Sequence, residues 1–171
     1  SQQVKTVGVT RNNEKEADAV AFVYMADSGY NVGAPAAVWQ RVIEHSGTAK
    51  SKGILDDVLN PSTHPESDSR RDSYATLMTK YSNNKVAVDS KSGEVKVNGK
   101  VFMKPANTKS MSGAQRSYLV AGNLARAYHA GPVGTARNDN GTVKIGSQAI
   151  VTPVTGDTSA DELVNIFNSI K

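Results

Sequence analysis

The spacing of hydrophobic residues in this 171-residue chain changes at Asn83-Asn84, and this change restricts the folds that the chain can adopt. Before Asn83, apolar residues recur every three or four positions, as they do on one face of a helix. After Asn84, short runs alternate between apolar and polar residues, as they do in strands with one buried face. We therefore predict an α+β protein in two parts, a helical segment over 1–83 and a small α+β domain over 84–171.

The first part is expected to contain three helices after a loose lead-in over residues 1–9. Pro35 and Pro65 suit the first positions of the second and third helices. Each helix is expected to bury an apolar stripe, which includes Val20, Val23 and Tyr24 in the first helix. The predicted helices cover 12–28, 34–46 and 65–81, and a polar connection over 47–63 separates the last two.

The second part has the predicted order βββ-α-βββ-α, which indicates an antiparallel sheet with helices packed on one face. Asn98-Gly99 is typical of a tight hairpin turn. Ser112 with Gln115 forms a capping box for a helix that ends near Ala130, and Ser159 with Glu162 begins the last helix. The predicted strands cover 85–89, 94–97, 100–103, 133–137, 142–146 and 148–152.

Composition excludes several kinds of partner and site. The net charge is +4, and Lys and Arg are dispersed rather than grouped with aromatic residues, which argues against nucleic-acid binding. No apolar stretch approaches the ~20 residues that a membrane-spanning helix needs. Without cysteine, the chain forms neither disulfides nor thiolate metal sites.

Two carboxylates in the first predicted helix have a spacing that suits a metal site. Glu14 and Asp18 are four residues apart, so they lie on the same helix face, one turn apart. One carboxylate can then bind a metal while the second orients a neighbouring histidine ligand. The alternative is an acidic first turn on an ordinary amphipathic helix that begins at Asn12-Asn13, where acids interact favourably with the helix dipole.

Three further motifs follow this pair in a characteristic order. They are Asp27-Ser28-Gly29-Tyr30 at the end of the first helix, Trp39 within the second, and Thr63-His64-Pro65 with Arg70 six residues after the histidine. Together with Glu14-x-x-Ala17-Asp18, this order resembles the zinc metallopeptidases (gluzincins) of the CAAX-prenyl-protease group, which includes HtpX-like membrane proteases and BepA-like periplasmic proteases. The resemblance covers residues 10 to 81 and implies the helical C-terminal half of a peptidase domain, whereas no family is recognised for the rest of the chain.

The resemblance implies a role for each motif residue. Glu14 would be the third zinc ligand, and Asp18 would accept the ring N–H of a ligand histidine. His64 would occupy the open position on the metal and hold the enzyme inactive, or else it simply precedes the third helix as a capping residue. Arg70 would donate to a substrate carbonyl or form a structural ion pair, and the ion pair is favoured. His45 and His129 are each explained by a place near a helix end.

One element of the family pattern is absent from the chain. The family takes two zinc ligands and its general base from His-Glu-x-x-His, but His45, His64 and His129 are the only histidines and none has that spacing. We therefore expect no catalytic residue in this chain, no activity from it alone, and zinc only in an intact parent protein.

Two hypotheses on function remain from the sequence. The first is the C-terminal part of a zinc endopeptidase of the bacterial cell envelope, on its periplasmic or extracellular face. Its partners would be the missing N-terminal catalytic part, a protein or peptide substrate, and a second copy of the chain, as a homo-oligomer or with exchanged helices. The second is a non-catalytic interaction module on a degenerate peptidase scaffold.

Overall fold

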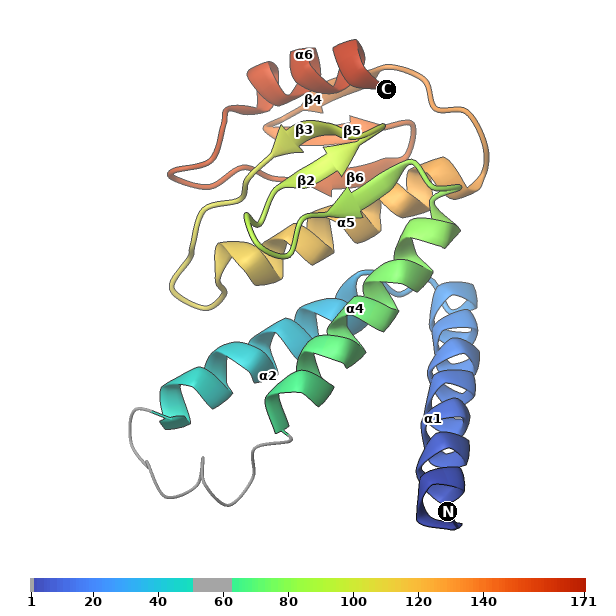
Figure 1. Cartoon of the computed structure of the whole chain (residues 1–171). Helices are drawn as coiled ribbons and strands as arrows, with labels where there is room; N and C mark the ends of the chain where they lie inside the picture. Colours follow the sequence, from blue (N-terminus) through green and yellow to red (C-terminus); the bar gives the residue numbers. More distant parts are fainter. Residues whose placement is uncertain (1, 51–62) are drawn as a thin grey trace.

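The computed structural model describes the backbone of residues 2–50 and 63–171, and side chains over 13–46 and 66–171. Its helices and short antiparallel strands confirm the predicted α+β class. The first region consists of helices, with α2 and α4 packed side by side and α1 packed against α4 (Figure 1). These helices are α1 (Gln2–Asp27), α2 (Ala34–Lys50) and α4 (Thr63–Tyr81).

The first helix differs from the expectation at its beginning. α1 runs from Gln2, so the predicted loose lead-in over 1–9 is wrong for residues 2–9. The first turn of α1 contains no acidic residue, and Glu14 therefore lies well inside the helix. α2 begins at the predicted residue but continues to Lys50. Of the predicted polar connection over 47–63, residues 51–62 lie outside the described part of the chain.

The second region follows the predicted order of elements, with one difference in topology. Its six strands form two separate three-stranded antiparallel sheets, β1-β2-β3 and β4-β5-β6, where we expected one sheet. Consecutive strands pair in each sheet because short turns connect them. The elements are β1 (Val86–Val88), β2 (Val95–Val97), β3 (Lys100–Met103), α5 (Gly113–His129), β4 (Ala136–Asp139), β5 (Thr142–Ile145), β6 (Gln148–Val151) and α6 (Ala160–Ile170).

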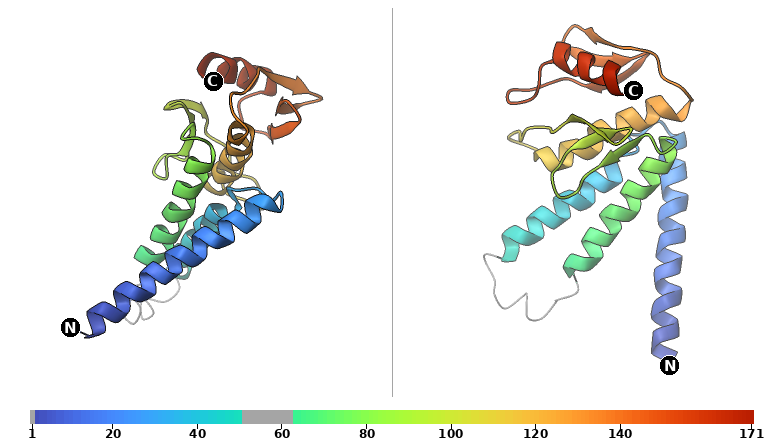
Figure 2. Two further views of the ribbon diagram at one scale, coloured as in Figure 1. Left: turned by 90° about the vertical axis from the view of Figure 1, so that its right-hand side faces the viewer. Right: turned by 45° about the horizontal axis from the view of Figure 1, so that its top comes forward.

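Helices cover both sides of these strands. α5 packs against strands of both sheets, and α6 packs on β3, β4 and β5 at the opposite side, as Figures 1 and 2 show. The core between them contains the fully buried rings of Phe102 and Phe167, whose centroids are 6.0 Å apart in an edge-to-face arrangement. The helices therefore enclose the strands from two sides, whereas we expected them on one face.

The predicted turn and cap chemistry of this region is confirmed. The Ser112 side chain accepts a hydrogen bond from the Gln115 backbone N–H at the start of α5, and Ser159 does the same with Glu162 at the start of α6. Asn98 has a positive φ of 52° in the hairpin between β2 and β3. These local signals fix where the elements of the second region begin.

The two regions meet at a close backbone contact between the α1–α2 loop and α5. A Cβ atom on Gly33 would lie 1.8 Å from the Tyr118 carbonyl oxygen, and one on Gly122 would lie 1.9 Å from Asn31 Oδ1. Asn31 Nδ2 donates to the Leu119 carbonyl at 2.9 Å. Buried residues from both sides of Asn83 belong to one hydrophobic core. The division into two domains at this point stays a prediction.

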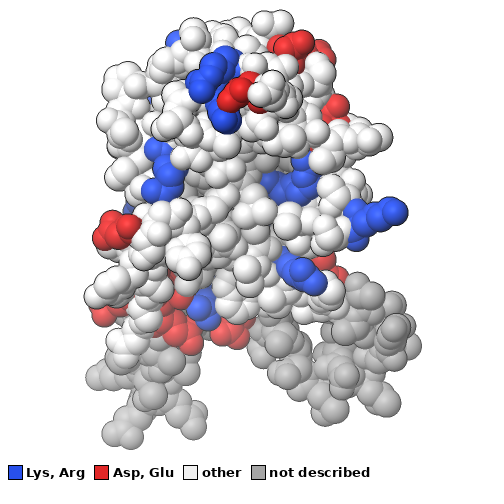
Figure 3. Space-filling view, turned by 180° about the vertical axis from the view of Figure 1, so that it is seen from behind, with Lys and Arg blue, Asp and Glu red and all other residues white. Residues whose placement is uncertain are grey.

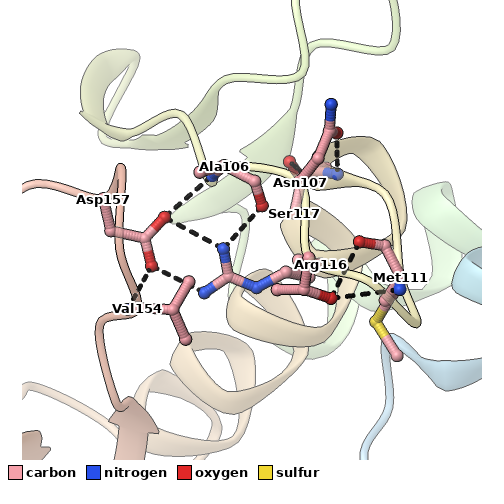
Figure 4. Close-up of polar contacts among 9 residues, drawn as sticks. Ala106, Asn107, Met111, Arg116, Ser117, Val154 and Asp157 are labelled. Carbon is pink, nitrogen blue, oxygen red and sulfur yellow. Dashed lines mark hydrogen bonds and ion pairs between the residues drawn. The ribbon is translucent and has the colours of Figure 1, made fainter.

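A buried ion pair fastens two loops of the second region to α5 (Figure 4). Arg116 Nη2 lies 2.7 Å from Asp157 Oδ2, and the Asp157 side chain has no exposed surface. Asp157 also accepts hydrogen bonds from the backbone N–H groups of Ala106 and Val154. The pair therefore joins the segment after β3 to the segment after β6.

The apolar stripes expected in the first two helices are only partly buried. Val20, Val23 and Tyr24 of α1 keep 56%, 57% and 72% of their surface exposed, and Val38 of α2 keeps 59%. Over the part of α1 whose side chains are described, Asp18, Phe22 and Ala26 are the buried residues. The predicted burial is therefore wrong for Val20, Val23 and Tyr24, because the described residues place no neighbour over that side of α1.

Candidate functional site

Three of the four sequence motifs converge where α1 meets α4. Arg70 Nη2 of α4 donates to Asp18 Oδ1 of α1 at 2.8 Å, and the Tyr74 hydroxyl donates to the same oxygen at 2.8 Å. The Arg70 guanidinium lies over the Trp39 ring of α2, 4.7 Å from its centroid. We call Asp18, Trp39, Arg70 and Tyr74 the Asp18 cluster. It connects residues far apart in the sequence.

The cluster provides the buried Asp18 carboxylate with a cation and a hydrogen-bond donor. Asp18 is 7% exposed, and a buried charge is stable only when it is paired and hydrogen-bonded. Burial by itself would lower the pKa of Arg70, but the hydrogen bond and charge of Asp18 outweigh burial, so the pKa is raised. Burial and the hydrogen bond to Asp18 both raise the pKa of Tyr74, which keeps its hydroxyl protonated as a donor.

Part of the hydrogen-bonding capacity of the Asp18 cluster is unused. Both donors use Asp18 Oδ1, and Oδ2 has no hydrogen-bond partner among the described residues. Arg70 Nε is buried and likewise lacks a partner in the described part of the chain. A carboxylate oxygen can accept further donors, so Asp18 Oδ2 keeps unused acceptor capacity.

Glu14 lies beside the Asp18 cluster, one helical turn before Asp18, and it is exposed. Its position inside α1 shows that the interpretation of Glu14 and Asp18 as first-turn acids is wrong. The dipole of the helix N-terminus acts only within the first turn, so it does not explain either residue. The exposed Glu14 carboxylate is free to contact a ligand.

An exposed apolar face of α1 adjoins Glu14. Ala17, Ala21 and Tyr24 follow Glu14 at spacings of three, four and three residues, so the four residues lie along one side of the helix. Ala17 and Ala21 are exposed, and Val20 and Tyr24 keep 56% and 72% of their surface exposed. We call these residues the α1 face. It presents large and small apolar side chains to the solvent next to a carboxylate.

The histidines occupy different places. His64 is in the first turn of α4, but its side chain lies outside the described residues, so its distance from Glu14 stays a prediction. His45 is exposed on α2, which continues to Lys50, so its expected place at the helix end is wrong. His129 does lie in the last turn of α5, where its ring stacks on Tyr81 with centroids 3.7 Å apart.

The described residues do not complete a zinc site. Nowhere among them do three or more His, Asp or Glu side chains come together as metal ligands would. A zinc site needs three or four protein ligands, whereas this face provides Glu14, with Asp18 Oδ1 already bonded to Arg70 and Tyr74. The remaining ligands would have to come from residues other than those described.

Charged side chains are unevenly distributed on the face opposite to the one shown in Figure 1. Asp and Glu side chains gather along its lower edge, beside the atoms that are not described, and Lys and Arg are spread over the rest of this face (Figure 3).

Within the described residues, no helix combines the length and the apolar character needed to cross a membrane.

Tyr74 is the one member of the Asp18 cluster that none of the sequence motifs contains. It follows Arg70 by four residues and so lies on the same face of α4, which is the signal that could have linked the two.

Comparison of the chain with models of protein families, with curated proteins and with solved structures found no match.

Proposed function

We propose that this chain is the C-terminal part of a zinc-dependent endopeptidase, in which Glu14 provides one zinc ligand and an upstream His-Glu-x-x-His helix provides the others. The observation that supports this most is the Asp18 cluster, which brings three of the four motifs together beside an exposed Glu14. Motifs that merely share an order in the sequence need not meet in space.

In this proposal the Asp18 cluster is a support for two zinc ligands. The bonds from Arg70 and Tyr74 hold α1 against α4 and so fix the position of Glu14. The unused Asp18 Oδ2 accepts the ring N–H of a histidine on the upstream helix, which selects the tautomer that binds metal. Zinc would supply polarisation of the peptide carbonyl and acidification of water.

The α1 face is where the upstream helix would pack. The small side chains of Ala17 and Ala21 allow close approach of another helix, and Val20 and Tyr24 provide apolar area to bury. A helix in this position would bring its histidines next to Glu14. The chain alone would be inactive, and His64 would act as an inhibitory ligand from the start of α4.

A second candidate is a non-catalytic interaction module of the bacterial envelope. It is favoured by further exposed apolar side chains that lie outside the α1 face, with Tyr30 67% and Val38 59% exposed. In this case apolar area on the helical region would bind a protein partner or a second copy, and Glu14 would bind no metal.

The test is to express the reading frame with the coding sequence upstream of Ser1, and to measure zinc content and cleavage of an unfolded protein. Glu14→Gln should lose both zinc and cleavage, because it removes a charged ligand. Glu16→Gln is the matched control, since Glu16 is an exposed acid of the same helix that points away from the Asp18 cluster.

The two candidates give opposite results. An upstream His-Glu-x-x-His, zinc binding that depends on Glu14 but not Glu16, and cleavage together support the peptidase. If no such motif precedes the chain, or if the Glu14 and Glu16 variants behave alike, the peptidase proposal fails and the interaction module replaces it.

A further inference from the structure

The end of α1 contains the one sequence motif that does not contribute to the Asp18 cluster. Gly29 has a positive φ of 80° there, and the Tyr30 N–H donates to the Met25 carbonyl at 3.2 Å. The Gly29 N–H donates to the Ala26 carbonyl, also at 3.2 Å. These two bonds form a Schellman motif, in which a glycine in the left-handed conformation closes a helix. The motif Asp27-Ser28-Gly29-Tyr30 therefore fixes where α1 ends.

Arg126 of α5 bonds directly to this helix end. Its Nη2 donates to the Tyr30 carbonyl at 2.7 Å and to the Ala26 carbonyl at 3.1 Å. A cation is favourable at this place, because the last carbonyl groups form the negative end of the helix dipole. The next residue of the loop also bonds to α5, since Asn31 Nδ2 donates to the Leu119 carbonyl. The second region therefore holds the end of α1 and the loop after it.

The helix α1 is thus held at two separate places. The Asp18 cluster holds it against α4, and Arg126 holds its end against α5. Between them, the rings of Phe22 and Tyr81 pack edge-to-face with centroids 6.0 Å apart, and the Arg126 guanidinium lies 5.8 Å from the Tyr81 ring. One holding point lets a helix pivot, whereas two fix the direction of its axis.

The direction of α1 decides where the Glu14 carboxylate lies. Figures 1 and 2 show that the N-terminal end of α1 points away from the second region. Without the bonds from Arg126, α1 could pivot about Asp18. Glu14 is about 6 Å along the axis from Asp18, so a pivot of about 10° would move it by about 1 Å. Metal–ligand distances vary by only about 0.2 Å, so this shift would weaken a zinc site.

We propose that Arg126 is a positioning residue, through which α5 sets the direction of α1 and with it the place of Glu14. The second region, which belongs to no recognised family, is then part of the support for the zinc site. The effect on zinc rests on the proposed function, whereas the effect on the direction of α1 does not.

The first test measures the direction of α1 in the chain itself. The chain has no cysteine, so Lys15→Cys and Thr76→Cys place spin labels at exposed positions of α1 and α4. Arg126→Met keeps an unbranched side chain but removes every donor, and it should broaden the distribution of distances between these labels. A second pair of labels, on Thr76 and on Asn165 of α6, should keep its distribution, because buried residues of α4 and α6 share one hydrophobic core.

Arg137→Met is the matched control for this measurement. Arg137 Nη1 also donates to a backbone carbonyl, that of Gly146 at 2.7 Å, but both residues lie in the second region. Its loss should leave the distributions of both label pairs unchanged. Arg126→Lys keeps a charge and a donor, so it should give a distribution between those of wild type and Arg126→Met.

The second test measures zinc affinity in the parent protein with its upstream sequence. Arg126→Met should weaken zinc binding about tenfold, which is at the lower end of the losses seen when groups that orient metal ligands are removed. Arg126→Lys should recover part of this affinity, and Arg137→Met should bind zinc as wild type does.

The two tests separate this inference from the proposed function. A broader α1 distribution together with a parent that binds no zinc would support the role of Arg126 and contradict the peptidase. Zinc binding that depends on Glu14, with zinc affinity and label distances unchanged in Arg126→Met, would overturn the role of Arg126. Broadening of both label pairs would also overturn it, because Arg126 would then support the whole fold rather than the direction of α1.

Discussion

Among the described residues, each region contains one Asp–Arg pair that joins distant segments, and the two pairs differ in how much of their hydrogen-bonding capacity they use. In the second region, both oxygens of Asp157 are bonded, to Arg116 and to two backbone N–H groups. In the first region, Asp18 uses only Oδ1 toward the described residues, and Arg70 leaves Nε unpaired among them. The Asp157–Arg116 pair is saturated and structural, whereas the Asp18–Arg70 pair has hydrogen-bonding capacity left for another group.

The two regions also differ in how completely they bury their apolar side chains, and the second region again leaves less unused. In the second region, α5 buries Leu124 and Tyr128, and α6 buries Leu163 and Phe167. In the first region, exposed apolar residues include Val38 and Val42 of α2 and the three α1 residues that were expected to be buried, Val20, Val23 and Tyr24. Unused hydrogen bonds and uncovered apolar side chains occur together on α1, as expected of a surface that receives another segment.

Removing each arginine in turn should give the largest difference in stability between the two pairs. Arg116→Ala leaves the fully buried Asp157 carboxylate without its cation and should lower the free energy of unfolding by about 4 kcal/mol. Arg70→Ala should cost about 1–2 kcal/mol, because Tyr74 still donates to Asp18 and the site is open on one side. Urea unfolding measures both values.

The surface pair between Lys144 and Asp139 is the control for these measurements. Both side chains are about one-third exposed, so Lys144→Ala should change the free energy of unfolding by less than ~1 kcal/mol. Equal losses for the Arg116 and Arg70 variants would contradict the distinction between a saturated and an open pair.

Acid should weaken the second region through Asp157. Burial alone would raise the pKa of Asp157, but Arg116 and the two backbone N–H groups outweigh it and lower the pKa from 3.8 to about 2. A lowered pKa in the folded state means that the stabilisation is complete above the unfolded-state pKa and disappears as pH falls toward the folded-state value. The contribution lost between about pH 5 and pH 2 is on the order of 2 kcal/mol.

The comparison with Asp157→Asn isolates this contribution. The variant has no carboxylate to protonate at this site, so the difference in unfolding free energy between it and the wild type should shrink as pH falls. A difference that is constant from about pH 5 to pH 2 would show that Asp157 titrates normally in the folded chain.

The sequence predicted the second region well because its signals are local. The Ser112 and Ser159 caps and the Asn98-Gly99 turn act within three or four residues, so short-range chemistry is enough to place them. The division into two sheets was not predicted, because it depends on how each hairpin packs against α5 and α6 rather than on any turn.

The first region was harder to predict because burial there depends on what covers each helix. Periodicity shows that Val20 and Tyr24 lie on a face of α1, but not whether another segment covers that face. The motifs did identify Asp18 and Arg70, which form an ion pair across 52 positions of the sequence. Tyr74 was not linked to them, because a partner that arrives through folding has no sequence signal beyond its four-residue spacing from Arg70.

The smallest predicted effect tests whether α1 can open locally while the rest of the fold stays closed. Asp18→Asn weakens the acceptor shared by Arg70 and Tyr74, which tie α1 to α4, and should cost about 1 kcal/mol. Because α1 packs chiefly on α4, the loss should appear as local opening, with amide hydrogen exchange about fivefold faster in α1 and little changed in α5. Asp27→Asn, which alters an exposed acid at the end of the same helix, is the control and should leave exchange unchanged. Exchange that rises equally in α1 and α5 would mean that Asp18 supports the whole fold, and the two Asp–Arg pairs would then be alike in their role.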